Sequence, residues 1–266
     1  MRIVLVTDSH LAPLDAKASA NWRAAREFTS RSRADLTIHL GDITAAGFDL
    51  EGEFTHAATL IAEWPTPMRL LPGNHDIGDN PPGPETPSKH PLDPARLAAY
   101  RRAFGPDYWA AEIEGWWLIA LDAQLFGLGD EHEAAQWDWL TARATEAAGR
   151  PIMLLSHKPL FQHGPDDAEP HIRYVPLVQR RRLMTLFAGL DLRLVLSGHT
   201  HQYLDRVIEG IRHIWLPATS YCFADSLQER IGEKIVGLGL LELDGDRCRV
   251  DLACPDGMTR HIYRAG

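Results

Sequence analysis

Five short polar motifs carry side chains that bind metal ions, and each motif directly follows a short apolar run. They are Thr7-Asp8-Ser9-His10, Gly41-Asp42, Gly73-Asn74-His75-Asp76, Ser156-His157 and Gly198-His199-Thr200-His201. Their carboxylate, amide and imidazole groups mix oxygen with nitrogen donors. This mixture suits Mn, Fe, Co, Ni or Zn and contains too much nitrogen for a calcium site. The motifs therefore predict a transition-metal site.

The number of candidate ligands indicates more than one ion. One ion with an open position needs fewer side chains, whereas two ions that share a bridging carboxylate need about this number. Two such ions lower the pKa of a bound water and hold phosphate oxygens for in-line attack. The sequence therefore predicts a dinuclear centre, and its candidate ligands are Asp8, His10, Asp42, Asn74, His157, His199 and His201.

The apolar runs before the motifs predict buried strands, and helical spacing appears between them. Strands are expected at 3–6, 36–40, 68–71, 117–121, 152–155 and 192–196. A helix is expected after Asp93-Pro94, closed by Gly105, because Asp caps helices, Pro starts them and Gly ends them. Strands that alternate with helices imply a layered α/β domain, and ligands bind at the carboxyl ends of its strands. We therefore expect the five motifs to converge.

The last third of the chain and two irregular stretches complete the predicted architecture. Strands are expected at 211–216, 236–243 and 247–252, the last two joined by a turn at Asp244-Gly245-Asp246. A proline-rich insertion at about 77–105 is predicted to form either a cap or a contact in a homodimer, and a second loop insertion spans about 159–176. The whole chain, 1–266, is predicted to be a single domain.

Composition limits the partners. The 266 residues carry 27 Lys and Arg against 36 Asp and Glu, a net charge of −9, which argues against nucleic acid as a partner. The apolar run at the N-terminus is too short for a signal peptide, and no segment is long enough to span a membrane. We expect a cytoplasmic protein that acts without a membrane.

The five motifs resemble the signature of the calcineurin-like metallophosphoesterases. That signature is DxH, then GD, then GNH followed by an acid, then a lone His, then GHxH, and all five blocks occur here in order between positions 8 and 201. The resemblance implies a four-layer αββα sandwich, in which two mixed β-sheets are flanked by helices, as in metallo-dependent phosphatases. The block from Gly73 to Asp76 is most similar to that of bacterial cyclic-nucleotide and glycerophosphodiester phosphodiesterases.

The resemblance also implies a role for each motif residue. One metal would be held by Asp8, His10, Asp42 and His201, and a second by Asp42, Asn74, His157 and His199, with Asp42 as the bridge. The metals would be Mn, Fe or Zn. His75 would stand off the metals and donate a proton to the leaving oxygen, and Asp76 would either orient that imidazole or cap a turn. Asn74 and His75 would also contact the substrate.

The resemblance also implies a small phosphoester as substrate, and further candidate contacts and rival functions accompany it. His163, His171, Arg173 and Tyr174, in the second insertion, are candidate substrate contacts. A small phosphodiester is the predicted substrate, and a phosphorylated metabolite cleaved as a monoester is the alternative. A nuclease is disfavoured because no basic and aromatic residues alternate to bind a strand. A scaffold without activity would lack metal ligands, and none is missing here.

Overall fold

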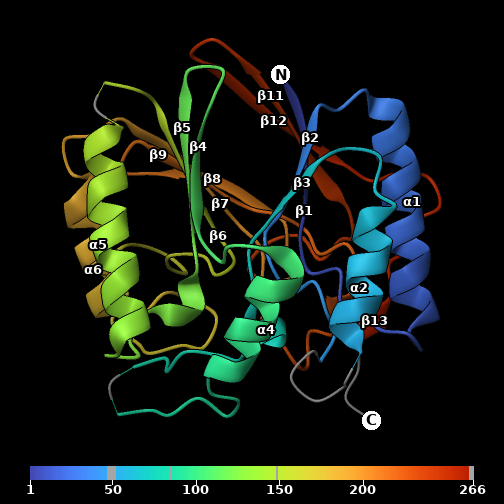
Figure 1. Cartoon of the computed structure of the whole chain (residues 1–266), viewed down its shortest axis with the longest axis horizontal. Helices are drawn as coiled ribbons and strands as arrows, with labels where there is room; N and C mark the ends of the chain where they lie inside the picture. The colour runs from blue at the N-terminus through green and yellow to red at the C-terminus, as the bar shows by residue number, and fades with distance from the viewer. Residues whose placement is uncertain (47–51, 84, 148, 264–266) are drawn as a thin grey trace.

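Two large mixed β-sheets pack face to face, with helices on both outer faces (Figure 1). The computed structural model describes residues 1–46, 52–83, 85–147 and 149–263. Helices α1 (Ala16–Ser32) and α2 (Glu53–Ala62) cover one sheet, and α5 (Glu131–Glu146) and α6 (Leu177–Phe187) cover the other. The predicted α/β sandwich of four layers is therefore confirmed.

The first sheet has the strand order β12-β11-β1-β2-β3. Strands β1, β2 and β3 are parallel, so their carboxyl ends lie at the same edge, whereas the β11–β12 hairpin pairs antiparallel with β1. The bounds are β1 (Arg2–Val6), β2 (Leu36–His39), β3 (Met68–Leu70), β11 (Leu238–Asp244) and β12 (Arg247–Ala253).

The second sheet has the order β4-β5-β6-β7-β9-β8, with β5, β6, β7 and β9 parallel. Its bounds are β4 (Trp109–Ile113), β5 (Trp116–Leu121), β6 (Ile152–Ser156), β7 (Leu192–Ser197), β8 (Leu204–Ile208) and β9 (Ile211–Trp215). Two short strands, β10 (Cys222–Phe223) and β13 (Ile262–Tyr263), pair with each other. The short elements α3 (Asn74–Ile77) and η1 (Ala123–Leu125) follow strands β3 and β5.

The central strands are buried on both faces, which explains their continuous apolar runs. In β1, Ile3 and Leu5 belong to the core between the sheets, while Val4 packs in the outer core with Trp22 of α1. In β6, Leu155 faces the same inter-sheet core, and Leu154 packs in the layer under α5 and α6. The two sheets are thus held together by a shared apolar layer that ends where the polar motifs begin.

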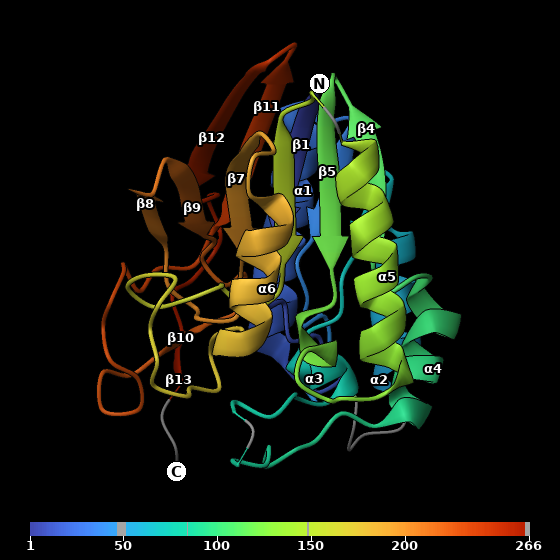
Figure 2. The same cartoon turned by 90° about the vertical axis from the view of Figure 1, so that its left-hand side faces the viewer.

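The two predicted insertions lie near the edge at which these strands end (Figure 2). In the first, the isolated bridges Asp79–Pro91 and Gly83–Thr86 precede helix α4 (Pro94–Phe104), while Pro84 lies outside the described residues. The helix N-cap predicted at Asp93 is present, because its side chain accepts a hydrogen bond of 2.8 Å from Ala95 N. In the described part of the chain, no helix is long and apolar enough to cross a bilayer.

Candidate metal centre

The five motifs converge at one edge of the sandwich. Asp8 and His10 follow β1, Asp42 follows β2, and the short helix α3 that begins with Asn74 follows β3 in the first sheet. His157 follows β6, and His199 and His201 follow β7 in the second sheet. Every predicted ligand therefore leaves the carboxyl end of a parallel strand, and the two sheets face each other with these ends side by side.

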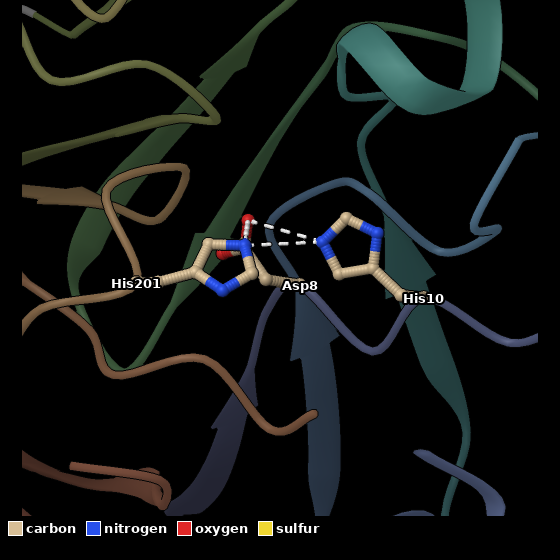
Figure 3. A group of neighbouring side chains, drawn as sticks. All are labelled: Asp8, His10 and His201. Carbon is tan, nitrogen blue, oxygen red and sulfur yellow. Dashed lines mark hydrogen bonds and ion pairs between the residues drawn. The ribbon is translucent and has the colours of Figure 1, made fainter. Parts of the chain in front are cut away.

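One group of side chains combines Asp8, His10 and His201 (Figure 3). Nε2 of His201 lies 3.3 Å from Oδ1 of Asp8 and 3.1 Å from Nε2 of His10. All three side chains are at most 2% exposed. The other oxygen of Asp8, Oδ2, accepts hydrogen bonds from Thr7 Oγ1 and from the backbone of His199. Asp8 therefore turns one oxygen toward the imidazoles and is fixed by the other.

A second group combines Asp42, His157 and His199 with Asn74 beside them. Nε2 of His157 lies 3.4 Å from Asp42 Oδ2, 3.1 Å from His199 Nδ1 and 3.3 Å from Asn74 Oδ1. The same Oδ2 of Asp42 lies 3.8 Å from Nε2 of His10 in the first group. The two groups therefore meet at one carboxylate oxygen.

Backbone carbonyls fix the protonation of two imidazoles. Nδ1 of His157 lies 2.7 Å from the carbonyl oxygen of Leu40, and Nδ1 of His201 lies 2.7 Å from that of Tyr221. A carbonyl oxygen only accepts, so each Nδ1 carries a hydrogen, and in the neutral ring each Nε2 presents a lone pair to its group. Metal-binding histidines are commonly oriented in this way. Nitrogen lone pairs facing carboxylate oxygens fit divalent transition-metal ions.

The charge state of the side chains in the two ligand groups also favours the binding of cations. Burial raises the pKa of Asp42, but the His157 and His75 imidazoles outweigh it and hold that pKa well below its usual value. Burial and His75 lower the pKa of His10, which keeps that ring neutral. Burial lowers the pKa of His157, but the Asp42 carboxylate reverses this and raises it to about 9. The buried carboxylates thus require positive charge close by.

Five predicted ligands have backbones in the left-handed region. The φ angles are 52° for Asp8, 46° for His10, 53° for Asp42, 66° for His199 and 51° for His201. They make up most of the non-glycine residues with positive φ in the described chain. This conformation costs free energy and concentrates at functional sites, where the surrounding structure enforces it. Here the backbone N–H of Asp8 donates to Gly41 O and that of His10 donates to Asp42 O.

The predicted catalytic pair, His75 and Asp76, lies beside the first group. His75 donates from its backbone N–H to Asp42 Oδ1 at 2.8 Å and from Nδ1 to Ala45 O. Its ligand atom lies within 4.8 Å of those of His10 and Asp42, so the geometry also accommodates His75 as a ligand. The role of His75 off the metals stays a prediction.

Asp76 is fully buried, and its carboxylate fixes two loops. It accepts hydrogen bonds from Thr44 N at 2.9 Å, Thr44 Oγ1 at 2.8 Å and Gly73 N at 2.9 Å. Burial and the Asp42 carboxylate raise its pKa to about 6. These contacts resemble those of a turn-capping aspartate and hold the segment that carries Ala45, the acceptor of His75. Its catalytic role stays a prediction.

A cavity of about 690 Å³ lies between the two insertions. Three of the four predicted substrate contacts, His163, His171 and Tyr174, line it. Arg173 does not line this cavity; its Nη1 lies 3.3 Å from Nε2 of His171. Contact with a substrate stays a prediction for all four.

Sequence reasoning missed two carbonyl groups that orient site histidines and one buried lysine next to a predicted ligand. The carbonyl acceptors of Leu40 and Tyr221 belong to the backbone, and side-chain identity gives no signal for them. Lys158, directly after the predicted ligand His157, is fully buried. A lysine at the end of an apolar strand and next to a ligand is the signal that could have identified it.

Comparisons with known proteins show which family the chain resembles. A family model of the calcineurin-like phosphoesterases matches residues 1–203. A 3',5'-cyclic adenosine monophosphate phosphodiesterase, CpdA of Escherichia coli, is 28% identical over 233 residues, covering 84% of this chain and 78% of its own. The human serine/threonine-protein phosphatase CPPED1 is 27% identical over 157 residues, covering 54% of this chain and 46% of its own.

A solved structure supports the fold. The crystal structure of a dimetal phosphatase from Danio rerio superposes with a TM-score of 0.65 at 14% identity, covering 95% of both chains. The family and the two ligand groups together indicate a dinuclear centre for divalent metals. Because the family match includes all five motif blocks, the chain belongs to the calcineurin-like phosphoesterases and is a metal-dependent phosphoester hydrolase.

Proposed function

We propose that this protein hydrolyses small phosphodiesters of the cyclic-nucleotide or glycerophosphodiester type at two transition-metal ions, Mn, Fe or Zn. The observation that carries the proposal is the meeting of two ligand groups at Asp42 Oδ2, 3.4 Å from His157 Nε2 and 3.8 Å from His10 Nε2. Similarity to the cyclic-nucleotide phosphodiesterase CpdA and the block from Gly73 to Asp76 support a diester substrate.

The ligand assignment follows the two groups. The first ion would be held by Asp8, His10, Asp42 and His201, and the second by Asp42, Asn74, His157 and His199. When bound, such a pair of ions neutralises the charge of the phosphate and lowers the pKa of a bound water to near neutral. Asp42 would serve both ions because its Oδ2 faces both groups.

The chain itself supplies the proton for the leaving oxygen. His75 is held at two points, through its backbone N–H to Asp42 and through Nδ1 to Ala45 O. Nε2 is therefore the atom that passes a proton to the leaving alkoxide, which is a poor leaving group without it. Asp76 keeps the acceptor segment in place through Thr44.

The cavity between the insertions would take the organic part of the substrate. Both of its loops start close to proposed ligands, one after helix α3 and the other after His157. Its wall combines apolar groups such as Pro81, Pro170 and Val175 with the rings of His171 and Tyr174. A pocket of this size and composition suits a small organic molecule.

A phosphomonoester is the second candidate substrate, because CPPED1, a serine/threonine-protein phosphatase, also matches this chain. The test compares Mn-reconstituted protein on bis(4-nitrophenyl) phosphate and on 4-nitrophenyl phosphate, followed by cyclic nucleotides, glycerophosphodiesters, nucleotides and sugar phosphates. We expect the diester to be cleaved faster. A monoester rate about a hundredfold higher, about 2.7 kcal/mol in barrier, would reverse the assignment. Near-zero metal uptake would favour a scaffold.

A further inference from the structure

A buried lysine joins the proline-rich insertion to the second ligand group. The Lys158 side chain is 0% exposed, and its Nζ lies 2.5 Å from Asp79 Oδ1 and 2.5 Å from Asn80 Oδ1. Asn80 is also fully buried, and its Nδ2 donates to the carbonyl of Phe126 at 2.8 Å. The ammonium group is thus enclosed between a carboxylate and an amide.

The backbone on both sides of this contact is fixed. Ser156 Oγ donates to the carbonyl of Lys158 at 2.9 Å. The backbone of Asp79 donates to His90 O at 2.7 Å and accepts from Leu92 N at 3.0 Å. The contact therefore connects two held segments rather than two mobile side chains.

The position of the contact along the chain gives it a consequence for the metal centre. Lys158 directly follows the proposed ligand His157, and Asp79 lies in the loop that follows helix α3, which begins with the proposed ligand Asn74. The ligand atoms of His157 and Asn74, Nε2 and Oδ1, lie 3.3 Å apart, although the two residues follow strands of different sheets. The ion pair spans the same two segments as the second metal site.

A buried ion pair costs desolvation energy, and breaking one partner leaves a charge without compensation. Lys158 and Asp79 belong neither to the proposed ligands nor to the apolar core. A pair at this place is positioned to hold the two ligand-bearing segments together, so its loss is expected to let them separate or shift.

We propose that Lys158 is a positioning residue whose ion pair with Asp79 fixes the separation of Asn74 and His157 and so sets the affinity of the second metal site. The inference rests on the proposed two-metal centre and deepens it, but it does not depend on the substrate. Loss of an outer contact that orients ligands lowers metal affinity by about 10- to 100-fold. The first site, built from Asp8, His10 and His201, should be affected far less.

The test measures Mn²⁺ binding to metal-free protein by calorimetric titration and by metal analysis of dialysed samples. Lys158→Met removes the ammonium, and Asp79→Asn removes the carboxylate charge while keeping its shape. We expect both variants to bind the first Mn²⁺ like the wild type and the second at least about tenfold more weakly. The double variant should lose no more than either single variant, because the pair is already broken.

The matched control is Asp107→Asn. Its carboxylate is 5% exposed and pairs with Arg101 at 2.7 and 2.9 Å, away from the proposed ligands. This variant should bind both ions like the wild type. Should Lys158→Met fail to fold, Asp79→Asn decides alone, because Asp79 is not adjacent to a ligand.

The outcomes separate this inference from the function on which it rests. Wild-type protein that binds two Mn²⁺ ions while both variants do so equally well overturns the inference alone. It is also overturned if both sites weaken together, or if Asp107→Asn has the same effect as Asp79→Asn. Wild-type protein that binds no Mn²⁺ overturns the proposed metal centre and the inference with it.

Discussion

The Oδ2 atom of Asp42 lies 3.4 Å from Nε2 of His157, although the two residues follow strands of different sheets. The same oxygen faces His10 at 3.8 Å. One carboxylate thus connects the two halves of the site, and its substitution tests the whole arrangement.

Asp42→Asn keeps the shape of the side chain but removes the charge that both ions would share. We expect the loss of both bound metals and a fall in diester hydrolysis of about a thousandfold or more, equivalent to about 4 kcal/mol in barrier. His199→Ala should lose only the second ion. Metal analysis and bis(4-nitrophenyl) phosphate turnover check this, with Asp205→Asn on β8 as the control. Full turnover in both site variants would refute the proposed centre.

His75→Gln tests the proposed proton donor. We expect retained metals and a loss of rate of about 10²- to 10⁴-fold on substrates with alkoxide leaving groups, because proton transfer contributes about that much. The loss should be smaller with 4-nitrophenolate, which leaves without a proton. His132→Gln on α5 serves as the control. If His75→Gln loses one ion together with activity, His75 is a ligand, as its distance from His10 and Asp42 would allow.

Val178→Trp tests the cavity between the insertions. Val178 lines the cavity and is 68% exposed, so a larger side chain fills space with little cost to folding. We expect KM for bis(4-nitrophenyl) phosphate to rise about tenfold, about 1.4 kcal/mol, and KM for methyl 4-nitrophenyl phosphate to change little. Val207→Trp, at a residue 65% exposed on β8, is the matched control. An unchanged KM for both substrates would show that the cavity does not take the organic group, and equal rises would assign it to the 4-nitrophenyl group that both substrates share.

His213 predicts how stability depends on pH. Burial, followed by the charge of Arg206, lowers its pKa from 6.5 to about 4. Because the unfolded chain binds the proton more tightly, the free energy of unfolding should fall as pH decreases from 6.5 through 4, by up to about 3 kcal/mol. His213→Gln should flatten this part of the profile, measured by urea unfolding at a series of pH values. Parallel profiles would contradict the assignment.

The fold class and the convergence of the motifs could be predicted because they depend on strand order and on short apolar runs. The predicted strands at 36–40 and 152–155 correspond to β2 and β6, each within one residue at either end. The hairpin was placed correctly, but Asp244 pairs with Arg247 in the ladder, so the turn itself contains only Gly245 and Asp246.

Helix α1 could not be predicted, because its buried face is not apolar enough. Small and polar residues such as Ala18, Asn21 and Thr29 are buried there beside Trp22. Asn21 is buried because it donates to the carbonyls of Ser220 and Thr259, which are remote in sequence. A pattern of apolar spacing does not register such contacts. The ion pair between Lys158 and Asp79 could not be predicted from the sequence for the same reason.

Each proposed ion draws its ligands from both sheets, and this arrangement gives the metals a mechanical role. A bound pair of ions would cross-link the two sheets at the edge where the apolar layer between them ends. Without it, that edge should open first, and amide exchange should accelerate in residues 7–10 and 198–201 before it does in the opposite ends of β1 and β7. The metal pair would thus stabilise the fold in addition to its role in catalysis.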